Sequence, residues 1–117
     1  MNSIAIPVAA PNANCAPLAD SRAAPMLAAL GSEPRLRVSR LLLKAGREGM
    51  SVTALQRATG IPPSTLGHHI SMLVEQGLVA QTRLGRELLC SAQYEQITQL
   101  SAFLLQECCA GPSANLR

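Results

Sequence analysis

The residues best suited to chemistry in this chain are its four cysteines, two of which are adjacent. Cys108 and Cys109 form a vicinal pair near the C-terminus, whereas Cys15 and Cys90 each stand alone. The N-terminus lacks the basic leader and unbroken apolar run of an export signal, so we expect a cytoplasmic protein. In that compartment cysteines serve as thiols or ligands more often than as structural disulfides. The pair therefore indicates two sulfur donors held close together.

His68 and His69 are the other side chains that suit chemistry. Adjacent side chains on a helix point about 100° apart, so the two rings are not expected to share a zinc ion. Asp20 is the only aspartate and lies in or beside the N-terminal arm, which argues against a Ser-His-Asp arrangement. Phosphate-cradling glycine loops are also missing. We predict that the protein is not an enzyme and has no permanently bound cofactor.

The composition is typical of one small helical domain. Of the 117 residues 48% are hydrophobic, yet Tyr94 and Phe103 are the only aromatics, so the core must be aliphatic. No apolar run approaches the roughly 18 residues of a membrane span, and no membrane partner is expected. Residues 33–90 carry eight cations and four acids, a net +4, whereas the flanking segments are neutral or negative. Positive charge confined to one segment is typical of a surface that contacts DNA phosphates.

Capping and turn residues divide the chain into elements. Residues 1–17 are rich in Pro, Ala and Asn and are expected to be a flexible arm, followed by a domain over 18–109 and a tail over 110–117. Ser32 and Ser51 are good N-caps. The expected helices cover residues 16–30, 32–46, 51–60, 63–77 and 94–109, and the expected strands cover 78–83 and 86–91.

Each expected helix has an apolar side that should face the core. The residues expected there are Leu18, Ala24, Leu27 and Leu30 in the first helix, Val38, Leu41, Leu42 and Ala45 in the second, Leu55 and Ala58 in the third, Leu66, Ile70, Leu73 and Val74 in the fourth, and Ile97, Leu100, Phe103, Leu104 and Cys108 in the last. So small a core gives modest stability, which favours a homodimer.

The third and fourth helices, joined at Gly60 and followed by a hairpin, predict a mainly α protein with a helix-turn-helix and a β wing. In such a fold the second of the two helices enters a groove of duplex DNA. Ser64, Thr65 and His68 lie on the side of that helix opposite its apolar stripe. They are therefore the candidates for contacts to base edges.

The wing adds two arginines to this surface. Arg83 and Arg86 flank the expected hairpin tip, Leu84-Gly85. Guanidinium groups at that place are suited to phosphate oxygens, which supply affinity without reading sequence. The predicted partner is double-stranded operator DNA.

Three segments carry a resemblance to a known family. They are LGSEPRLRVSRLL (30–42), STLGHHISMLVEQGLV (64–79) and TRLGRELLC (82–90). They resemble the ArsR/SmtB winged helix-turn-helix repressors, and the likeness covers roughly residues 18–109. It implies a homodimer formed through the first and last helices. It also implies that a metal, metalloid or thiol-reactive ligand weakens binding to the operator.

The reading helix departs from the family pattern in ways that matter for DNA. The family favours a polar pair at its start, where this chain has Pro62-Pro63, and basic or polar residues where it has Gly67, His68 and Ser71. The helix is therefore less basic than in similar proteins, and the wing arginines should supply more of the phosphate attraction. His69 matches a histidine common in the family, which implies that it braces the helix or a phosphate.

The resemblance also suggests what the cysteines bind. Arsenite-sensing relatives have cysteines where this chain has Ser51 and Thr53, but another branch ends its last helix with a Cys-Cys pair, as Cys108 and Cys109 do here. Thiolates suit As(III), methylarsenite and Sb(III), the expected inducers. Inorganic As(III) takes three sulfurs and methylarsenite two.

Cys90 and Cys15 are the candidates for a third sulfur. Cys90 and Cys108 would lie about 20 Å apart along the last helix at 1.5 Å per residue, so they can meet only across a dimer.

Three alternatives stay open. The pair Cys108 and Cys109 is also compatible with a dithiol redox or persulfide switch, although the partial negative charge at a helix C-terminus disfavours thiolate. A winged-helix DNA-binding regulator would need no thiol ligand, and a small buried cysteine can simply be a core residue. A module that binds no DNA is the third, favoured only by the weakly basic reading helix.

Overall fold

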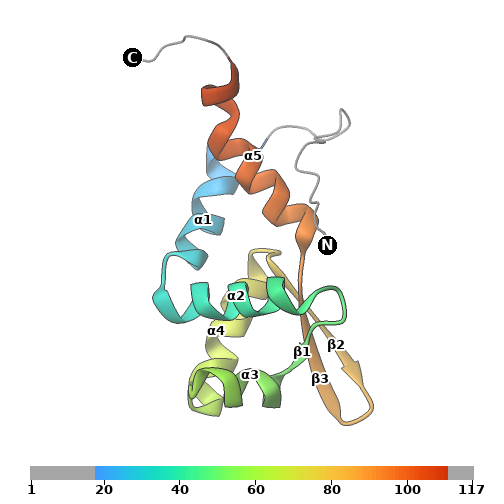
Figure 1. The fold of residues 1–117 in the computed structure, drawn as a ribbon. Coiled ribbons are helices and arrows are strands. Elements are labelled where there is room, and N and C mark those ends of the chain that lie inside the picture. Colours follow the sequence, from blue (N-terminus) through green and yellow to red (C-terminus); the bar gives the residue numbers. More distant parts are fainter. Residues whose placement is uncertain (1–17, 111–117) are drawn as a thin grey trace.

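The computed structural model of the chain describes residues 18–110, with side chains described as far as Gln106. Five helices pack beside a small antiparallel sheet, which lies at one edge of the molecule and has the strand order β1-β3-β2 (Figure 1). The elements are α1 (Asp20–Leu30), α2 (Glu33–Ala45), β1 (Met50–Ser51), α3 (Val52–Thr59), α4 (Pro63–Glu75), β2 (Val79–Leu84), β3 (Glu87–Ala92) and α5 (Tyr94–Ala110). The order confirms the predicted winged helix-turn-helix.

Short polar contacts set the helix ends, as the sequence indicates. The side chain of Ser32 accepts a hydrogen bond from the backbone N–H of Arg35, and that of Ser51 accepts one from Ala54. Such caps satisfy N–H groups that have no partner within the helix. Gly60 ends α3 in the left-handed region, with φ of 73°. The turn at Gly60 separates α3 from α4.

The first helix differs from the prediction in its start and in its buried side. It begins at Asp20 rather than at residue 16, after an extended Ala19. Its buried residues are Ala23, Met26 and Ala29. The predicted side was wrong for Leu27, which is 37% exposed, because α1 is apolar on two sides and periodicity alone could not choose between them.

The sheet has a third strand that the sequence did not reveal. In β1, Met50 pairs with Cys90 and Ser51 with Leu89, so β3 lies in the middle. Gly49 makes this possible, because a Cβ there would collide with the carbonyl oxygen of Cys90, and its φ is +75°. A two-residue strand is too short to show an alternating pattern, which is why the expected sheet was only a hairpin.

The wing turn is shifted by one residue from the prediction. Leu84 pairs with Glu87, so the two turn residues are Gly85 and Arg86. Gly85 has φ of 63°, a conformation that suits a tight two-residue hairpin. Arg86 is therefore part of the tip itself rather than beside it.

A single aliphatic core joins the helices to the sheet. Its buried hydrophobic residues are Ala23, Met26, Ala29, Val38, Leu42, Leu55, Leu66, Ile70, Leu73, Leu78, Val79, Cys90, Ala92 and Leu100. Besides Leu27, three residues expected inside are exposed instead, namely Ala24, Ala58 and Leu104. The Tyr94 hydroxyl donates to the carbonyl oxygen of Leu43 at 2.9 Å and ties the start of α5 to α2.

Within residues 18–110 no helix has the length and apolarity that crossing a membrane requires.

Candidate nucleic-acid interface

The surface of α4 is divided between a buried stripe and an exposed polar face. Leu66, Ile70 and Leu73 are almost completely buried, which confirms the predicted apolar side. Ser64, Thr65 and His68 are exposed on the other side of the helix. Hydroxyl and imidazole groups both donate and accept hydrogen bonds, so this face can contact base edges and phosphates.

The start of α4 adds to this face. Pro62 is the N-cap residue, and no side chain caps the helix there. The first N–H groups of a helix need partners and carry partial positive charge, which favours a phosphate. The two prolines that depart from the family pattern therefore still leave a helix start suited to an anion.

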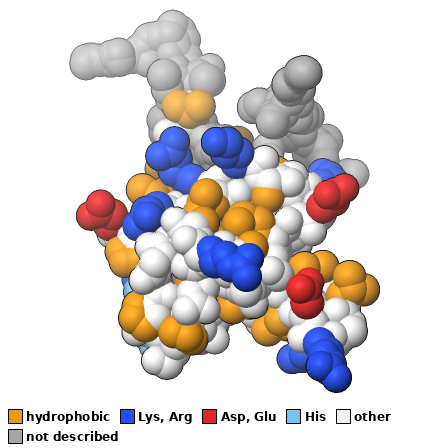
Figure 2. All heavy atoms as spheres, turned by 60° about the horizontal axis from the view of Figure 1, so that its bottom comes forward, with side chains coloured by type: hydrophobic (Ala, Val, Ile, Leu, Met, Phe, Trp, Pro, Cys, Tyr) orange, Lys and Arg blue, Asp and Glu red, His pale blue; other side chains and the backbone are white. Residues whose placement is uncertain are grey.

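The wing provides the positive charge that α4 lacks. Arg83 on β2 and Arg86 in the turn are exposed, although Arg86 was expected beside the hairpin tip rather than in it. Lys and Arg side chains gather at the tip of the wing, at the lower right of Figure 2. Leu84 lies between the two arginines and is 63% exposed. The wing can thus reach a DNA backbone while α4 occupies a groove.

His69 is half-buried and does not share the outward direction of His68. Its Nδ1 lies 3.3 Å from Nη1 of Arg35, which belongs to α2. Burial lowers the pKa of His69, and the nearby charges of Arg35 and His68 lower it further. A neutral imidazole can accept a hydrogen bond from Arg35, so His69 braces α4 against α2 in this structure.

A second arginine joins α4 to the first helix. Arg22 on α1 donates from Nη2 to the carbonyl oxygen of Gln76 at 3.0 Å and from Nη1 to its side-chain oxygen at 3.3 Å. Gln76 is the C-cap residue of α4. A cation at this end of a helix satisfies a terminal carbonyl and interacts favourably with the helix dipole.

The structure places Cys90 in the core of the domain. It is fully buried in β3, opposite Met50 of β1 and Gln81 of β2. Gln81 donates from Nε2 to Cys90 Sγ at 3.8 Å. Burial raises the pKa of the Cys90 thiol, and the hydrogen bond from Gln81 opposes that shift only in part. The thiol is therefore kept protonated and away from solvent.

The other cysteines lie at or beyond the limits of what the structure describes. Cys108 and Cys109 belong to the last turn of α5, which extends to Ala110, but their side chains fall outside the described residues, as does Cys15. Within the described part of the chain no three His, Cys, Asp or Glu side chains gather in a way that would hold a metal ion. The structure thus places the backbone of the vicinal pair in a helix, and the positions of the two sulfur atoms lie outside what it describes.

Sequence reasoning did not find Arg22 or Arg35, the two arginines that contact α4 from neighbouring helices. In the sequence both residues entered only the count of positive charges. Their partners are 34 to 54 residues away in sequence, apart from the short link between Arg35 and the end of α1. No local pattern reports contacts of that kind.

Known proteins share the helix-turn-helix fold of this chain. Residues 30–82 match a family model described as a helix-turn-helix domain. No curated protein is similar enough in sequence to count as a relative. Similar solved structures share the fold over most of both chains.

An ArsR-like transcriptional regulator from Rhodococcus sp. RHA1 is 24% identical, with a TM-score of 0.64, over 74% of this chain and 78% of that one. The transcriptional repressor BigR from Xylella fastidiosa is 25% identical, with a TM-score of 0.60, over 78% and 90%. The homodimeric winged helix-turn-helix domain of Mb0332 from Mycobacterium bovis, titled a possible ArsR-family regulator, is 26% identical, with a TM-score of 0.61, over 79% and 87%.

The protein is a winged helix-turn-helix protein, a class that binds duplex DNA through a recognition helix and a wing. The matched segment and the arrangement of all five helices give it the fold of the ArsR-family transcriptional regulators. The proteins that it resembles are regulators and not enzymes, which agrees with the sequence prediction.

Proposed function

We propose that the protein is a dimeric repressor that leaves its operator when Cys108 and Cys109 bind trivalent arsenic or antimony. The observation that carries this proposal is the position of the vicinal pair on α5, away from the reading helix α4. A ligand there does not compete directly with DNA. It acts by changing how α5 packs.

Exposed apolar residues on α1 and α5 support a dimer through these helices. Leu27 on α1 is 37% exposed, and Leu104 and Leu105 on α5 are 57% and 56% exposed. Figure 1 shows the two helices together at the end of the molecule opposite α3 and the wing tip. A second copy would cover these side chains, and a similar protein, the Mb0332 domain, is homodimeric. Two reading helices about 34–36 Å apart would then match a palindromic operator.

The sulfur chemistry of the pair fits methylarsenite most simply. In this reaction two thiols replace the two hydroxyl groups on arsenic, which leave as two molecules of water, and no electron is transferred. Each cysteine loses its proton as the As–S bond forms, so the thiols need not be ionised beforehand. Inorganic As(III) or Sb(III) would need a third sulfur.

The burial of Cys90 bears on that third sulfur. Because the Cys90 side chain is fully buried in the middle strand of the sheet, it is not positioned to bind a metalloid at the end of α5. Cys15 remains the other candidate from the same chain or from a second copy. The proposal therefore favours a site that needs two sulfurs.

The experiment measures release from DNA. A duplex selected from a random library by the reduced wild-type protein serves as the operator, and methylarsenite, arsenite and antimonite are titrated into the complex. Release should require both members of the pair, so Cys108→Ser and Cys109→Ser should stay bound at concentrations that free the wild type. Coupling of this kind is typically about 5- to 150-fold in affinity.

For methylarsenite, which needs two sulfurs, Cys15→Ser and Cys90→Ala are the matched controls, because each removes one sulfur and leaves the pair intact. Unchanged release from Cys108→Ser and Cys109→Ser would refute the metalloid site. Release by peroxide or persulfide but not by arsenicals would point instead to a dithiol switch.

A further inference from the structure

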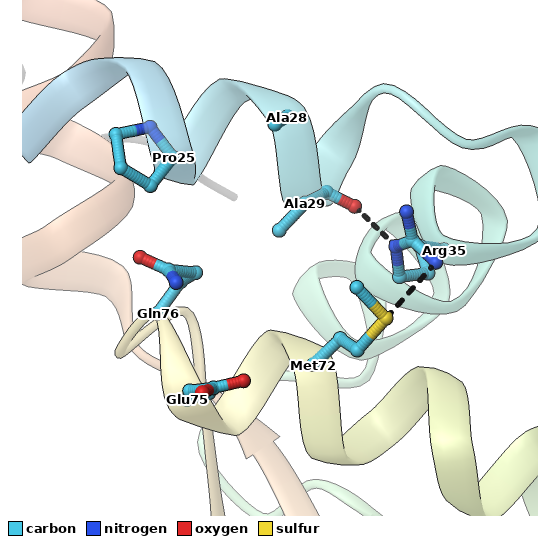
Figure 3. Close-up of a pocket in the computed structure, with 7 residues that line it drawn as sticks. All are labelled: Pro25, Ala28, Ala29, Arg35, Met72, Glu75 and Gln76. Carbon is cyan, nitrogen blue, oxygen red and sulfur yellow. Dashed lines mark hydrogen bonds between the residues drawn. The ribbon is translucent and has the colours of Figure 1, made fainter.

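A hollow lies between α1 and α4, on the side where the two helices are joined by arginines (Figure 3). Its volume is about 260 Å³. The lining residues are Pro25, Ala28 and Ala29 of α1, Arg35 of α2, and Met72, Glu75 and Gln76 of α4. Hydrocarbon packing does not fill this part of the joint, so polar contacts across it matter more for the angle between the helices.

Arg35 lies at one edge of the hollow and contacts two helices besides its own. Its Nε donates to the carbonyl oxygen of Ala29 at 2.7 Å, in the last turn of α1. Its Nη1 lies 3.3 Å from Nδ1 of His69 and 3.4 Å from Sδ of Met72. His69 and Met72 are three residues apart and so lie on the same side of α4. One planar group therefore joins the end of α1 to the middle of α4.

We propose that Arg35 is a positioning residue that holds the reading helix α4 at a defined angle to α1. The inference rests on the proposed function, because it gives α1 a place in the dimer and α4 the contact with DNA. A guanidinium group is rigid and donates in fixed directions. A rotation of α1 that moves the Ala29 carbonyl therefore shifts the guanidinium group and, with it, the contacts to α4. Arg35 thus connects the proposed dimer helices to the DNA-reading surface.

The first test compares three variants by their affinity for the selected operator and for an unrelated duplex of equal length. Arg35→Gln removes both the charge and the planar guanidinium group with its fixed donor directions. Arg35→Lys keeps the charge and removes the planar group. Both should bind the operator about 5- to 10-fold more weakly, the size expected for a residue that couples two sites. Binding to the unrelated duplex should change little, because the Arg35 guanidinium is already engaged with Ala29, His69 and Met72.

Arg37→Gln is the matched control. Arg37 is exposed and lies two residues from Arg35 on the same helix, and within residues 18–110 its side chain makes no hydrogen bond or ion pair with α4. This variant loses the same charge and should keep the selectivity of the wild type. Thermal melting of all variants confirms that each is folded. Full operator affinity in Arg35→Lys would overturn the positioning role.

The second test needs no DNA. Imidazole NMR signals of the full-length protein are followed against pH, and the pKa of His69 should rise in Arg35→Gln because a neighbouring positive charge is removed. An unchanged His69 titration would show that the contact is absent and would also overturn the proposal. Failure of the proposed function has a different signature, since the wild-type complex would then ignore arsenicals whatever residue 35 is.

Discussion

The two ends of the molecule expose opposite kinds of surface. At one end α4 buries Leu66, Ile70 and Leu73, and α4 and the wing present hydroxyl, imidazole and guanidinium groups to solvent beside one exposed leucine at the wing tip, Leu84. At the other end α1 and α5 bury one apolar side and expose another, with Leu27, Leu104 and Leu105 in contact with water. A polar, positively charged face suits DNA, whereas an uncovered aliphatic face suits another protein surface. One small domain thus separates its two kinds of recognition.

The largest effect should come from charging the apolar end. Replacing both Leu104 and Leu105 by Glu would place like charges in the interface of the proposed dimer, and sedimentation should show a monomer. Operator affinity should fall by about 100-fold or more, because two linked half-site contacts become one. Leu36→Glu, a control on the exposed part of α2, should remain dimeric. A dimer that survives both Glu substitutions would show that the apolar end formed by α1 and α5 is not the dimer interface.

A smaller effect is expected from the base-reading face of α4. His68→Ala should cost about 1–3 kcal/mol of operator binding and relax the preference at one base pair. Competition with a set of singly substituted operators measures both quantities. Equal weakening on every sequence would mean that His68 contacts only the backbone.

The wing should act on all duplexes alike. Arg86→Gln removes a cation from the hairpin tip and should lower the slope of log affinity against log salt by about 0.9 for one lost phosphate contact. Titrations at several salt concentrations provide the slope. An unaltered slope would exclude Arg86 from the DNA surface.

The smallest effect concerns the pH dependence of stability at His69, which contacts Arg35 between the two ends of the molecule. The pKa of His69 is lowered in the folded protein. The neutral ring therefore contributes to stability at pH values above the ordinary histidine pKa, and this contribution is lost as the pH falls below that pKa. Urea unfolding of the wild type should show a decline in the free energy of unfolding on acidification to pH ~5.5, below the ordinary histidine pKa of about 6.5. His69→Gln should lessen this decline, and an identical decline in both proteins would rule out His69 as its source.

Prediction from sequence was most successful where local chemistry decides the structure. Ser32, Ser51 and Gly60 end or begin helices through contacts within a few residues, and they were identified correctly. The stripe on α4 was also predicted, because only one side of that helix is apolar. The buried side of α1 and the strand β1 were not found, because each depends on which distant segment lies against it.

The sequence by itself determined the order of the five helices and the hairpin, the polar face of α4 and the position of two adjacent thiols near the end of the last helix. Only the tertiary structure decided that Cys90 is a core residue with a raised pKa and that Arg35 contacts both α1 and α4. The physical reason is the distance in sequence over which each interaction acts. Helix caps and periodic patterns act over one or two turns, whereas burial and guanidinium contacts arise between segments that folding brings together.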